Sequence, residues 1–406
     1  MPLTDLISTV SPQRQVAIRT GLPNYPFTPS GNTNYAECQA WMSTVICYAT
    51  NNLRIGWANY RYAPGFDGIT GKKEIIGGVT NMTVRAAVSI SGVDYPLYTT
   101  DGQRDLVIAP DAIGIFAPLN LAISAQTSAL IKYLLKYDAI PPQWNMMVNN
   151  QASLVGRNEF GTGLTDRTTS ANWTAPNHID YLPMPPQFIL GDTTNTKSFE
   201  IWGDSIGAGG TGDMGYVSDL GFLQRAARAS YIPYITNGAG GKALWQYTST
   251  DPDFVESRNR RRALAPSTAT GFCFIQMCTN DFAWGGTSSS VIANMQLMAQ
   301  QALARGQKPI IFTCPPRTNN TNNGKYGPDA AAVPTYINEY NAHVRTNNGY
   351  GYGYVDLGLL WADTVDNTKW NASYFGDGIH PGQPGYVAAD TLMQSKFPVL
   401  TQIWRN

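Results

Sequence analysis

The chain has 406 residues, of which 43% are hydrophobic and 14% charged, with 28 basic and 28 acidic side chains. A chain of this length exceeds one ordinary core and predicts two domains. A neutral, charge-poor chain argues against electrostatic binding to nucleic acid or to an anionic membrane, so we expect neither partner. The one basic cluster, Arg258 to Arg262, is short, and we interpret it as a solvated face or a local salt-bridge site.

The five cysteines show no metal-type spacing such as C-x-x-C. We therefore expect buried, reduced thiols, no metal and no cofactor. The N-terminus has no basic segment followed by an apolar one, and no apolar run approaches the roughly 18 residues of a membrane span. We therefore expect neither a secretory signal nor a membrane span within this sequence. The sequence leaves open whether the protein is cytoplasmic, virion-associated or exported by another route.

The N-terminal half shows strand patterns. Residues 1–30 are rich in Pro, Thr and Ser and predict an extended arm, whereas residues 38–55 fit either a helix or a strand. Residues 84–90 alternate between apolar and other side chains, which predicts a half-buried strand. Short apolar runs separated by turns continue to residue 135 and favour a β-sandwich of the jelly-roll kind. Residues 150–195 are polar and rich in Gly, Thr, Asn and Pro, which predicts a linker or a long loop.

From residue 196 onward, strands and helices alternate. Apolar runs predict strands, and amphipathic segments predict helices near residues 216–227, 291–305, 336–345 and 386–397, with Gly306 at a helix end. Alternation over this length predicts a three-layer α/β domain with a parallel sheet covered on both faces. We place one domain at residues 1–195 and the second at 196–406. The strand predictions are residues 199–202, 232–235, 272–277, 309–313 and 354–357.

Four short stretches follow these elements and carry reactive side chains or glycines. They are Gly203-Asp204-Ser205, the glycine-rich residues 237–241, Cys278-Thr279-Asn280-Asp281 and Asp377-Gly378-Ile379-His380. Functional residues in such sheets gather beyond the carboxyl ends of the strands. Together these stretches supply a nucleophile, backbone donors, an amide donor and a base with its carboxylate, which acyl transfer to water requires.

The catalytic roles follow from the chemistry of each group. Ser205 attacks an ester carbonyl, His380 takes and returns the proton, and Asp377 fixes the histidine tautomer. The N–H groups of Ser205 and Gly241 and the side-chain amide of Asn280 hold the oxyanion. Asp204 and Asp281 are interpreted as loop braces through hydrogen bonds to backbone N–H groups.

This set of residues resembles the SGNH (GDSL-type) hydrolase family, whose Ser, Gly, Asn and His match Ser205, Gly241, Asn280 and His380. Asp377 stands at the family's D-x-x-H position. The resemblance covers roughly residues 198–400 and implies a flavodoxin-like fold and hydrolysis through an acyl-serine intermediate. The sequence departs from the family pattern at two points. Cys278 stands where the family has glycine, and the glycine-rich stretch 237–241 is shorter than in the family, which leaves Gly240 as an alternative to Gly241 for the oxyanion donor. The N-terminal module also resembles β-modules attached to family members that act on polysaccharides.

Other interpretations fit parts of this pattern less well. Gly203 to Gly207 also satisfies G-x-S-x-G of the α/β-hydrolases, but there the acid normally lies well before the histidine. Residues 238–242 lack the leading glycine and the hydroxyl of a phosphate loop. The remaining histidines, His178 and His343, lie in a polar segment and within a predicted helix. Trp202, Trp245, Tyr247 and Trp284 lie near the motifs and fit either sugar stacking or the core.

The sequence thus predicts a metal-independent serine esterase that acts on O-acetyl groups of a carbohydrate or another small ester. Polar, aromatic-rich loops, the attached β-module and the lack of a long apolar lid favour a carbohydrate. A lipase or thioesterase of the same fold is an alternative. A second alternative is a glycan-binding or attachment protein, such as a bacteriophage virion component, with a minor esterase site.

Overall fold

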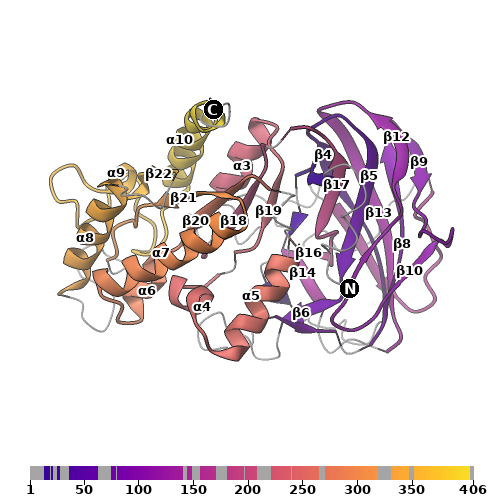
Figure 1. Ribbon diagram of the computed structural model, residues 1–406, viewed down its shortest axis with the longest axis horizontal. Coiled ribbons are helices and arrows are strands. Elements are labelled where there is room, and N and C mark those ends of the chain that lie inside the picture. Colours follow the sequence, from indigo (N-terminus) through magenta and orange to yellow (C-terminus); the bar gives the residue numbers. More distant parts are fainter. Residues whose placement is uncertain are drawn as a thin grey trace. The chain divides into compact units, whose positions relative to one another are not determined.

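The computed structural model describes residues 13–18, 20–21, 25–27, 36–62, 75–78, 80–139, 144–148, 156–170, 181–195, 197–207, 221–238, 240–264, 270–318, 331–346 and 352–402. The chain folds into two compact units (Figure 1). The first comprises Met1–Ser198, Tyr231–Thr236 and Glu256–Ala269, and the second comprises Phe199–Ser230, Asn237–Val255 and Thr270–Asn406. Within the described ranges, every helix is too short or too polar to cross a membrane.

The first unit consists mainly of two antiparallel sheets. One sheet has the order β1-β17-β5-β11 with β12 also on β5, and the other has the order β10-β8-β13-β4-β15 with β9 also on β8. The strands of the first sheet are β1 (Gln13–Gln15), β17 (Phe188–Asp192), β5 (Thr50–Ala58), β11 (Ile113–Ile115) and β12 (Leu119–Ile123). Those of the second are β10 (Asp105–Ile108), β8 (Met82–Ile90), β13 (Thr127–Tyr137), β4 (Glu37–Ile46), β15 (Gly156–Gly161) and β9 (Val93–Pro96).

Both sheets bury side chains in one hydrophobic core. Leu53, Ile55 and Trp57 of β5 belong to the same cluster as Val84 and Tyr133 of the other sheet. The Trp57 ring lies 5.8 Å from the Tyr133 ring. The strand predicted at residues 84–90 is confirmed as β8, and the segment 38–55 forms two strands, β4 and β5.

The prediction of a linker or long loop at residues 150–195 is wrong for much of its described part. β15 pairs with β4, and β17 pairs with both β1 and β5. These strands are short and contain or adjoin Gly, Pro and Asn, which concealed their pattern in the sequence. Of the predicted N-terminal arm, residues 1–12 lie outside the described ranges, and β1 is part of a sheet. The unit's other strands are β2 (Thr20–Gly21), β3 (Tyr25–Phe27), β6 (Tyr60–Tyr62), β7 (Ile75–Gly77), β14 (Trp144–Val148), β16 (Tyr181–Pro183) and β19 (Tyr234–Thr236).

The second unit is organised around parallel strands. β18 (Phe199–Gly203) pairs with β20 (Phe272–Gln276), β20 with β21 (Lys308–Phe312), and β21 with β22 (Gly353–Val355), all in parallel. The predicted strand at 232–235 corresponds to β19 of the first unit, which pairs in parallel with β2 of that unit. All five residues of β18 and of β20 are buried, as expected for strands covered on both faces.

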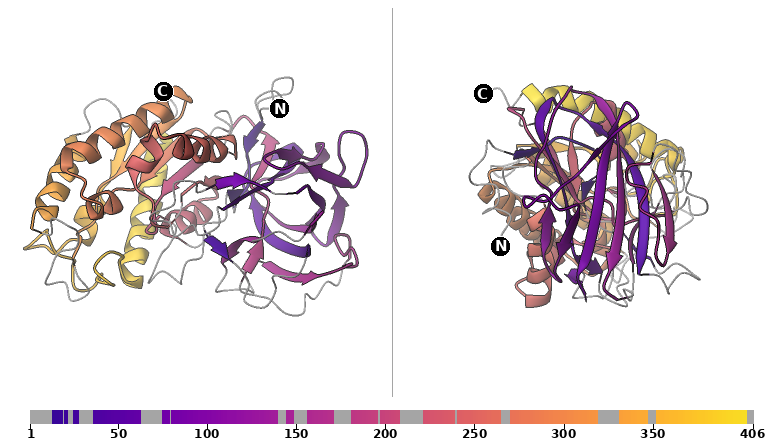
Figure 2. Two further views of the ribbon diagram at one scale, coloured as in Figure 1. Left: turned by 90° about the horizontal axis from the view of Figure 1, so that it is seen from below. Right: turned by 90° about the vertical axis from the view of Figure 1, so that its right-hand side faces the viewer.

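Helices cover both faces of these strands (Figures 1 and 2). On one face, α7 (Ser288–Ala304) and α8 (Val333–Thr346) share a core cluster with Ile275 of β20 and Ile311 of β21. On the other face, Phe397 of α10 (Gln383–Gln402) stacks on Phe274, and Phe222 of α3 (Phe222–Ala229) packs on Phe312. This arrangement confirms the predicted α/β layering.

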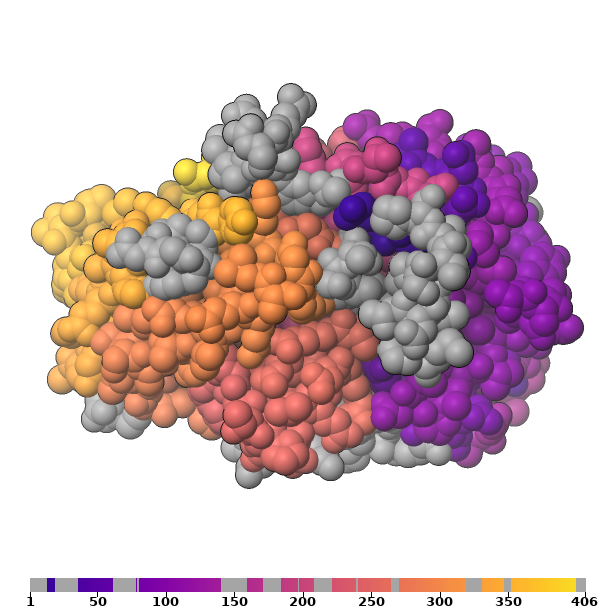
Figure 3. All heavy atoms as spheres, in the orientation of Figure 1, coloured from indigo at the N-terminus to yellow at the C-terminus, as the bar shows by residue number. Residues whose placement is uncertain are grey.

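The predicted helices are present with shifted bounds. α3 begins at Phe222, and residues 208–220 lie outside the described ranges. α7 ends at Ala304, and Gly306, just beyond the C-cap Arg305, has a φ of 73°, which confirms the predicted helix-terminating glycine. Orange atoms, the colour of residues near 300, lie on the face of the molecule shown in Figure 3. The sequence did not predict α4 (Leu244–Thr248), α5 (Pro252–Leu264), α6 (Thr279–Ala283) or α9 (Leu357–Trp361). The basic cluster lies on α5, where Arg260 pairs with Glu256 and Asp111.

Candidate active site

Ser205 lies in the turn that directly follows β18. The Asp204 N–H donates to the carbonyl of Gln276 on the neighbouring strand at 3.2 Å. The Ile206 N–H donates to the Asp204 carboxylate at 2.8 Å. These two bonds fix the backbone on both sides of the serine, which is 8% exposed. The turn therefore presents Ser205 from a rigid support at the carboxyl end of the strand.

Three glycines allow the backbone to pack tightly around this turn. A Cβ atom on Gly238 would lie 2.4 Å from the carbonyl oxygen of Gly203 and 2.5 Å from its nitrogen. A Cβ atom on Gly207 would lie 2.4 Å from Oε1 of Gln276. The Asn237 N–H donates to the carbonyl of Ile201 at 2.8 Å and holds the glycine loop against β18. A side chain at Gly238 would displace the turn that carries Ser205.

Ser205, His380 and Asp377 form a continuous chain of hydrogen bonds. Ser205 Oγ lies 2.7 Å from His380 Nε2, and His380 Nδ1 lies 2.8 Å from Asp377 Oδ2. Because an ionised carboxylate can only accept, the proton of the neutral ring lies on Nδ1 and Nε2 is left to accept the serine proton. His380 is only 9% exposed, so its ring is largely shielded from water.

Asp377 is held by its own loop as well as by the histidine. Its Oδ1 accepts hydrogen bonds from the backbone N–H groups of Ile379 at 2.9 Å and His380 at 2.7 Å. Partial burial raises the pKa of Asp377, but the bonds from the His380 side chain and backbone and from Ile379 outweigh it and bring the pKa to about 2. The carboxylate is therefore charged throughout the neutral range.

Asn280 faces the glycine loop. Its Nδ2 donates to the carbonyl of Lys242 at 2.9 Å, directly after Gly241, which has a φ of 76°. This bond connects the third predicted stretch to the second. Cys278, where the resembled family has glycine, has a φ of 176°. That is extended backbone that any residue can adopt, so this substitution imposes no strain through φ.

Asp204 and Asp281 are buried carboxylates that hold backbone N–H groups beside these loops. Asp281 accepts from the N–H groups of Leu244 at 2.9 Å and Trp245 at 3.1 Å. Burial raises the pKa of Asp281 to about 7 and that of Asp204 to about 6, although the backbone hydrogen bonds act in the opposite direction. Their geometry is that of loop braces.

Residues 201–388 match the model of the GDSL-like lipase/acylhydrolase family. These residues belong to that family. A search of curated proteins found no match to the chain.

Several solved structures are similar to the chain. A family two carbohydrate esterase from Clostridium thermocellum is 12% identical with a TM-score of 0.39, over 95% of this chain and 99% of that one. A carbohydrate esterase family 2 enzyme with a carbohydrate binding domain from Corynascus thermopiles is 15% identical with a TM-score of 0.40. The match covers 94% of this chain and 98% of that one. A GDSL-like lipase from Bacteroides thetaiotaomicron is 17% identical with a TM-score of 0.37. The match covers 50% of this chain and 89% of that one.

The GDSL-like domain contains one contributor that sequence reasoning missed. Arg317 is 6% exposed, and its Nη1 donates to the carbonyl of Thr279 at 3.2 Å and to the Thr279 hydroxyl at 3.1 Å. The next N–H, of Thr318, donates to the carbonyl of Gly378 at 2.9 Å. This segment thus connects the loop of Asn280 to the loop of Asp377 and His380. The one feature of the sequence that could have indicated this role is the position of Arg317 shortly after the predicted strand at residues 309–313.

The aromatic residues near the motifs of the GDSL-like domain divide into two groups. Trp202 and Tyr247 are buried and their rings pack at 4.9 Å, so they belong to the core. Trp245 and Trp284 line a pocket. His343 lies on α8, and His178 lies outside the described ranges. Across the described ranges, no group of three or more His, Cys, Asp or Glu side chains has the arrangement of a metal site.

Proposed function

We propose that the protein is a serine esterase that removes O-acetyl groups from a carbohydrate. The observation that carries the proposal is the chain Ser205 Oγ, His380 Nε2, His380 Nδ1 and Asp377 Oδ2, with separations of 2.7 Å and 2.8 Å. A nucleophile, a base and an orienting carboxylate joined in this way are the parts that acyl transfer requires.

In the proposed reaction, Ser205 Oγ attacks the ester carbonyl carbon while its proton moves to His380 Nε2. The electrons of the carbonyl double bond move to its oxygen. When this intermediate collapses, the bond to the sugar oxygen breaks, and that oxygen takes the proton from Nε2. Water then attacks the acyl-serine in the same manner, releasing acetate and restoring the serine. Asp377 keeps the Nδ1 proton in place and stabilises the positive ring that forms at each transfer.

We assign the oxyanion to the N–H groups of Ser205 and Gly241 and to the Asn280 amide. The bond from Asn280 Nδ2 to the Lys242 carbonyl supports this assignment, because it fixes the amide beside the Gly241 loop. Nδ2 carries two hydrogens, so one remains for the oxyanion. Arg317 acts as a positioning residue through Thr279. Removing one oxyanion donor typically lowers the rate by about 100- to 1000-fold.

The proposed substrate rests on features around this site. Trp245 and Trp284 lie close to the proposed oxyanion loops, and aromatic faces suit sugar rings. Residues 1–195 are proposed as an accessory, carbohydrate-binding-like β-sandwich of the jelly-roll kind, and residues 196–406 as the catalytic domain. The core shared by two antiparallel sheets supports the sandwich.

Chain-length specificity tests the proposed substrate. We expect kcat/KM for 4-nitrophenyl acetate to exceed that for the octanoate ester by at least about tenfold, since a pocket for acetyl excludes each added methylene. We also expect acetate release from partially acetylated oligosaccharides. A preference for octanoate or longer esters would indicate a lipase or thioesterase instead. Binding of the oligosaccharide with no hydrolysis of any ester would favour an attachment protein.

A further inference from the structure

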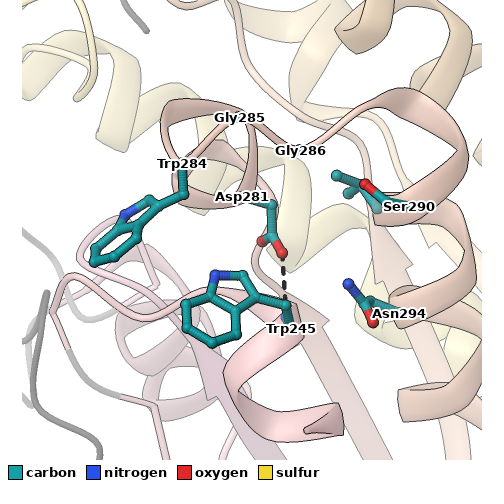
Figure 4. Close-up of a pocket in the computed structure, with 8 residues that line it drawn as sticks. Trp245, Asp281, Trp284, Gly285, Gly286, Ser290 and Asn294 are labelled. Carbon is teal, nitrogen blue, oxygen red and sulfur yellow. Dashed lines mark hydrogen bonds between the residues drawn. The ribbon is translucent and has the colours of Figure 1, made fainter. Parts of the chain in front are cut away.

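A pocket of about 260 Å³ lies beside the proposed oxyanion loops (Figure 4). It is lined by residues of α4, α6 and α7 and of the turn between α6 and α7: Trp245, Asp281, Trp284, Gly285, Gly286, Ser290, Val291 and Asn294. Its volume is below the roughly 300 Å³ at which pockets for drug-sized ligands begin, so it suits one small ring. No residue of this pocket takes part in the reaction proposed above.

The two indole rings form an angled wall. Their centroids are 5.9 Å apart and their planes meet at 55°, and Trp284 is 40% exposed. The Phe254 ring packs edge-to-face against the Trp245 ring, with the two centroids 5.4 Å apart, and this contact holds the Trp245 ring in place. An exposed tryptophan face beside a fixed one offers a stacking surface for a ring with aliphatic C–H groups.

Polar groups face the same space. Figure 4 shows the Asn294 amide nitrogen pointing toward the pocket and the Trp245 ring nitrogen facing Asp281. The Asn294 oxygen accepts from Thr248 at 2.8 Å, which fixes the orientation of the amide. Among described residues, the ring N–H groups of Trp245 and Trp284 and the Asn294 NH₂ have no hydrogen-bond partner. These donors are available to the oxygen atoms of a ligand.

The chemistry of the lining selects a neutral ligand. No Lys, Arg or His lines the pocket, which disfavours an anion. The only carboxylate, Asp281, already accepts two backbone N–H groups and is 1% exposed, so it is a poor counter-ion for a cation. Aromatic faces combined with N–H donors fit a sugar, which presents apolar C–H faces and hydroxyl oxygens.

The pocket is also physically tied to the proposed oxyanion site. Asp281 directly follows Asn280, and Trp245 donates its backbone N–H to Asp281 three residues after Lys242, whose carbonyl holds the Asn280 amide. We propose that this pocket binds one sugar ring of the carbohydrate that carries the ester, next to the ring that is deacetylated. This inference rests on the proposed function and adds a subsite to it.

The test compares Trp284→Ala and Asn294→Ala with Tyr352→Ala, an exposed aromatic residue of the same unit that stacks with Lys308. For partially acetylated oligosaccharides of two to four rings, we expect the two pocket variants to raise KM about tenfold, the size of one good stacking contact. 4-nitrophenyl acetate has no sugar, so both pocket variants should hydrolyse it at a rate within about twofold of the unmodified protein. Tyr352→Ala should hydrolyse both the oligosaccharides and 4-nitrophenyl acetate at unchanged rates.

A binding measurement separates this inference from the proposed function. The deacetylated oligosaccharide is titrated into the Ser205→Ala protein, with and without Trp284→Ala, and tryptophan fluorescence is followed. Weaker binding in the double variant supports the subsite even if no ester is hydrolysed, in which case only the proposed function fails. Equal affinities overturn the subsite. Equal losses of 4-nitrophenyl acetate and oligosaccharide hydrolysis in Trp284→Ala, or displacement of the sugar by choline, also overturn it.

Discussion

Ser205→Ala is expected to reduce ester hydrolysis by at least about 10⁴-fold, because it removes the atom that forms the acyl intermediate. The only hydrogen bond from Ser205 Oγ that the structure places within the described ranges leads to His380, at 2.7 Å. Deleting this hydroxyl leaves Asp377 bound to the histidine at 2.8 Å. We therefore expect kcat to fall while the fold is retained. The measurement is the initial rate of 4-nitrophenyl acetate hydrolysis, with thermal unfolding as a check on the fold.

Ser373→Ala is the matched control for this variant. Ser373 is exposed and lies in the same segment as Asp377 and His380. Its substitution should leave the rate within about twofold, as is usual for surface changes away from special features. If Ser205→Ala kept a substantial part of the activity, another residue would have to be the nucleophile.

Asp377→Asn is expected to lower kcat by about 10³- to 10⁴-fold. Two backbone N–H groups donate to Oδ1 of Asp377, so the oxygen of the new amide will stay there. Its NH₂ group then faces His380 Nδ1 as a donor, which forces the ring proton onto Nε2. In that tautomer, Nε2 cannot accept the proton of Ser205.

The control for Asp377→Asn is Asp366→Asn, which removes a partly exposed carboxylate paired with Lys369 at 3.3 Å. We expect it to retain its activity. The pKa of Asp377, about 2, lies below the usual value, so its charge is lost only as the pH falls through about 2. No limb of the activity profile between pH 5 and pH 8 should therefore come from Asp377. Full activity of Asp377→Asn would show that the histidine tautomer is fixed by another group.

The α/β layering could be predicted because its strands are short apolar runs bounded by glycine or polar residues. β18 and β20 are buried throughout, and such strands are readable without alternation. Three of the four motif stretches directly follow predicted strands, which placed their residues at the carboxyl ends of parallel strands, whereas the fourth precedes the last helix. What periodicity cannot provide is distance, so the bonds that join Ser205, His380 and Asp377 required the structure.

Other features depend on tertiary contacts that the sequence does not display. β15 and β17 lie in a segment whose composition indicated a loop, and their pairing with β4 and β5 overrides that local preference. The role of Arg317 depends on Thr279, which is distant in the sequence. Trp202 and Trp284 both lie next to motif residues in the sequence, so the sequence does not distinguish them. Only their burial in the structure assigns Trp202 to the core and Trp284 to the pocket.

Covalent labelling tests most directly whether Ser205 is an activated nucleophile. The protein is incubated with diisopropyl fluorophosphate, and the modified peptide is identified by mass spectrometry. We expect one phosphoryl group per chain, attached to Ser205, and a labelling rate that falls by orders of magnitude in His380→Ala, because His380 Nε2 is the base that takes the serine proton. Labelling of a different serine, or labelling of Ser205 at an unchanged rate in His380→Ala, would contradict the proposed mechanism.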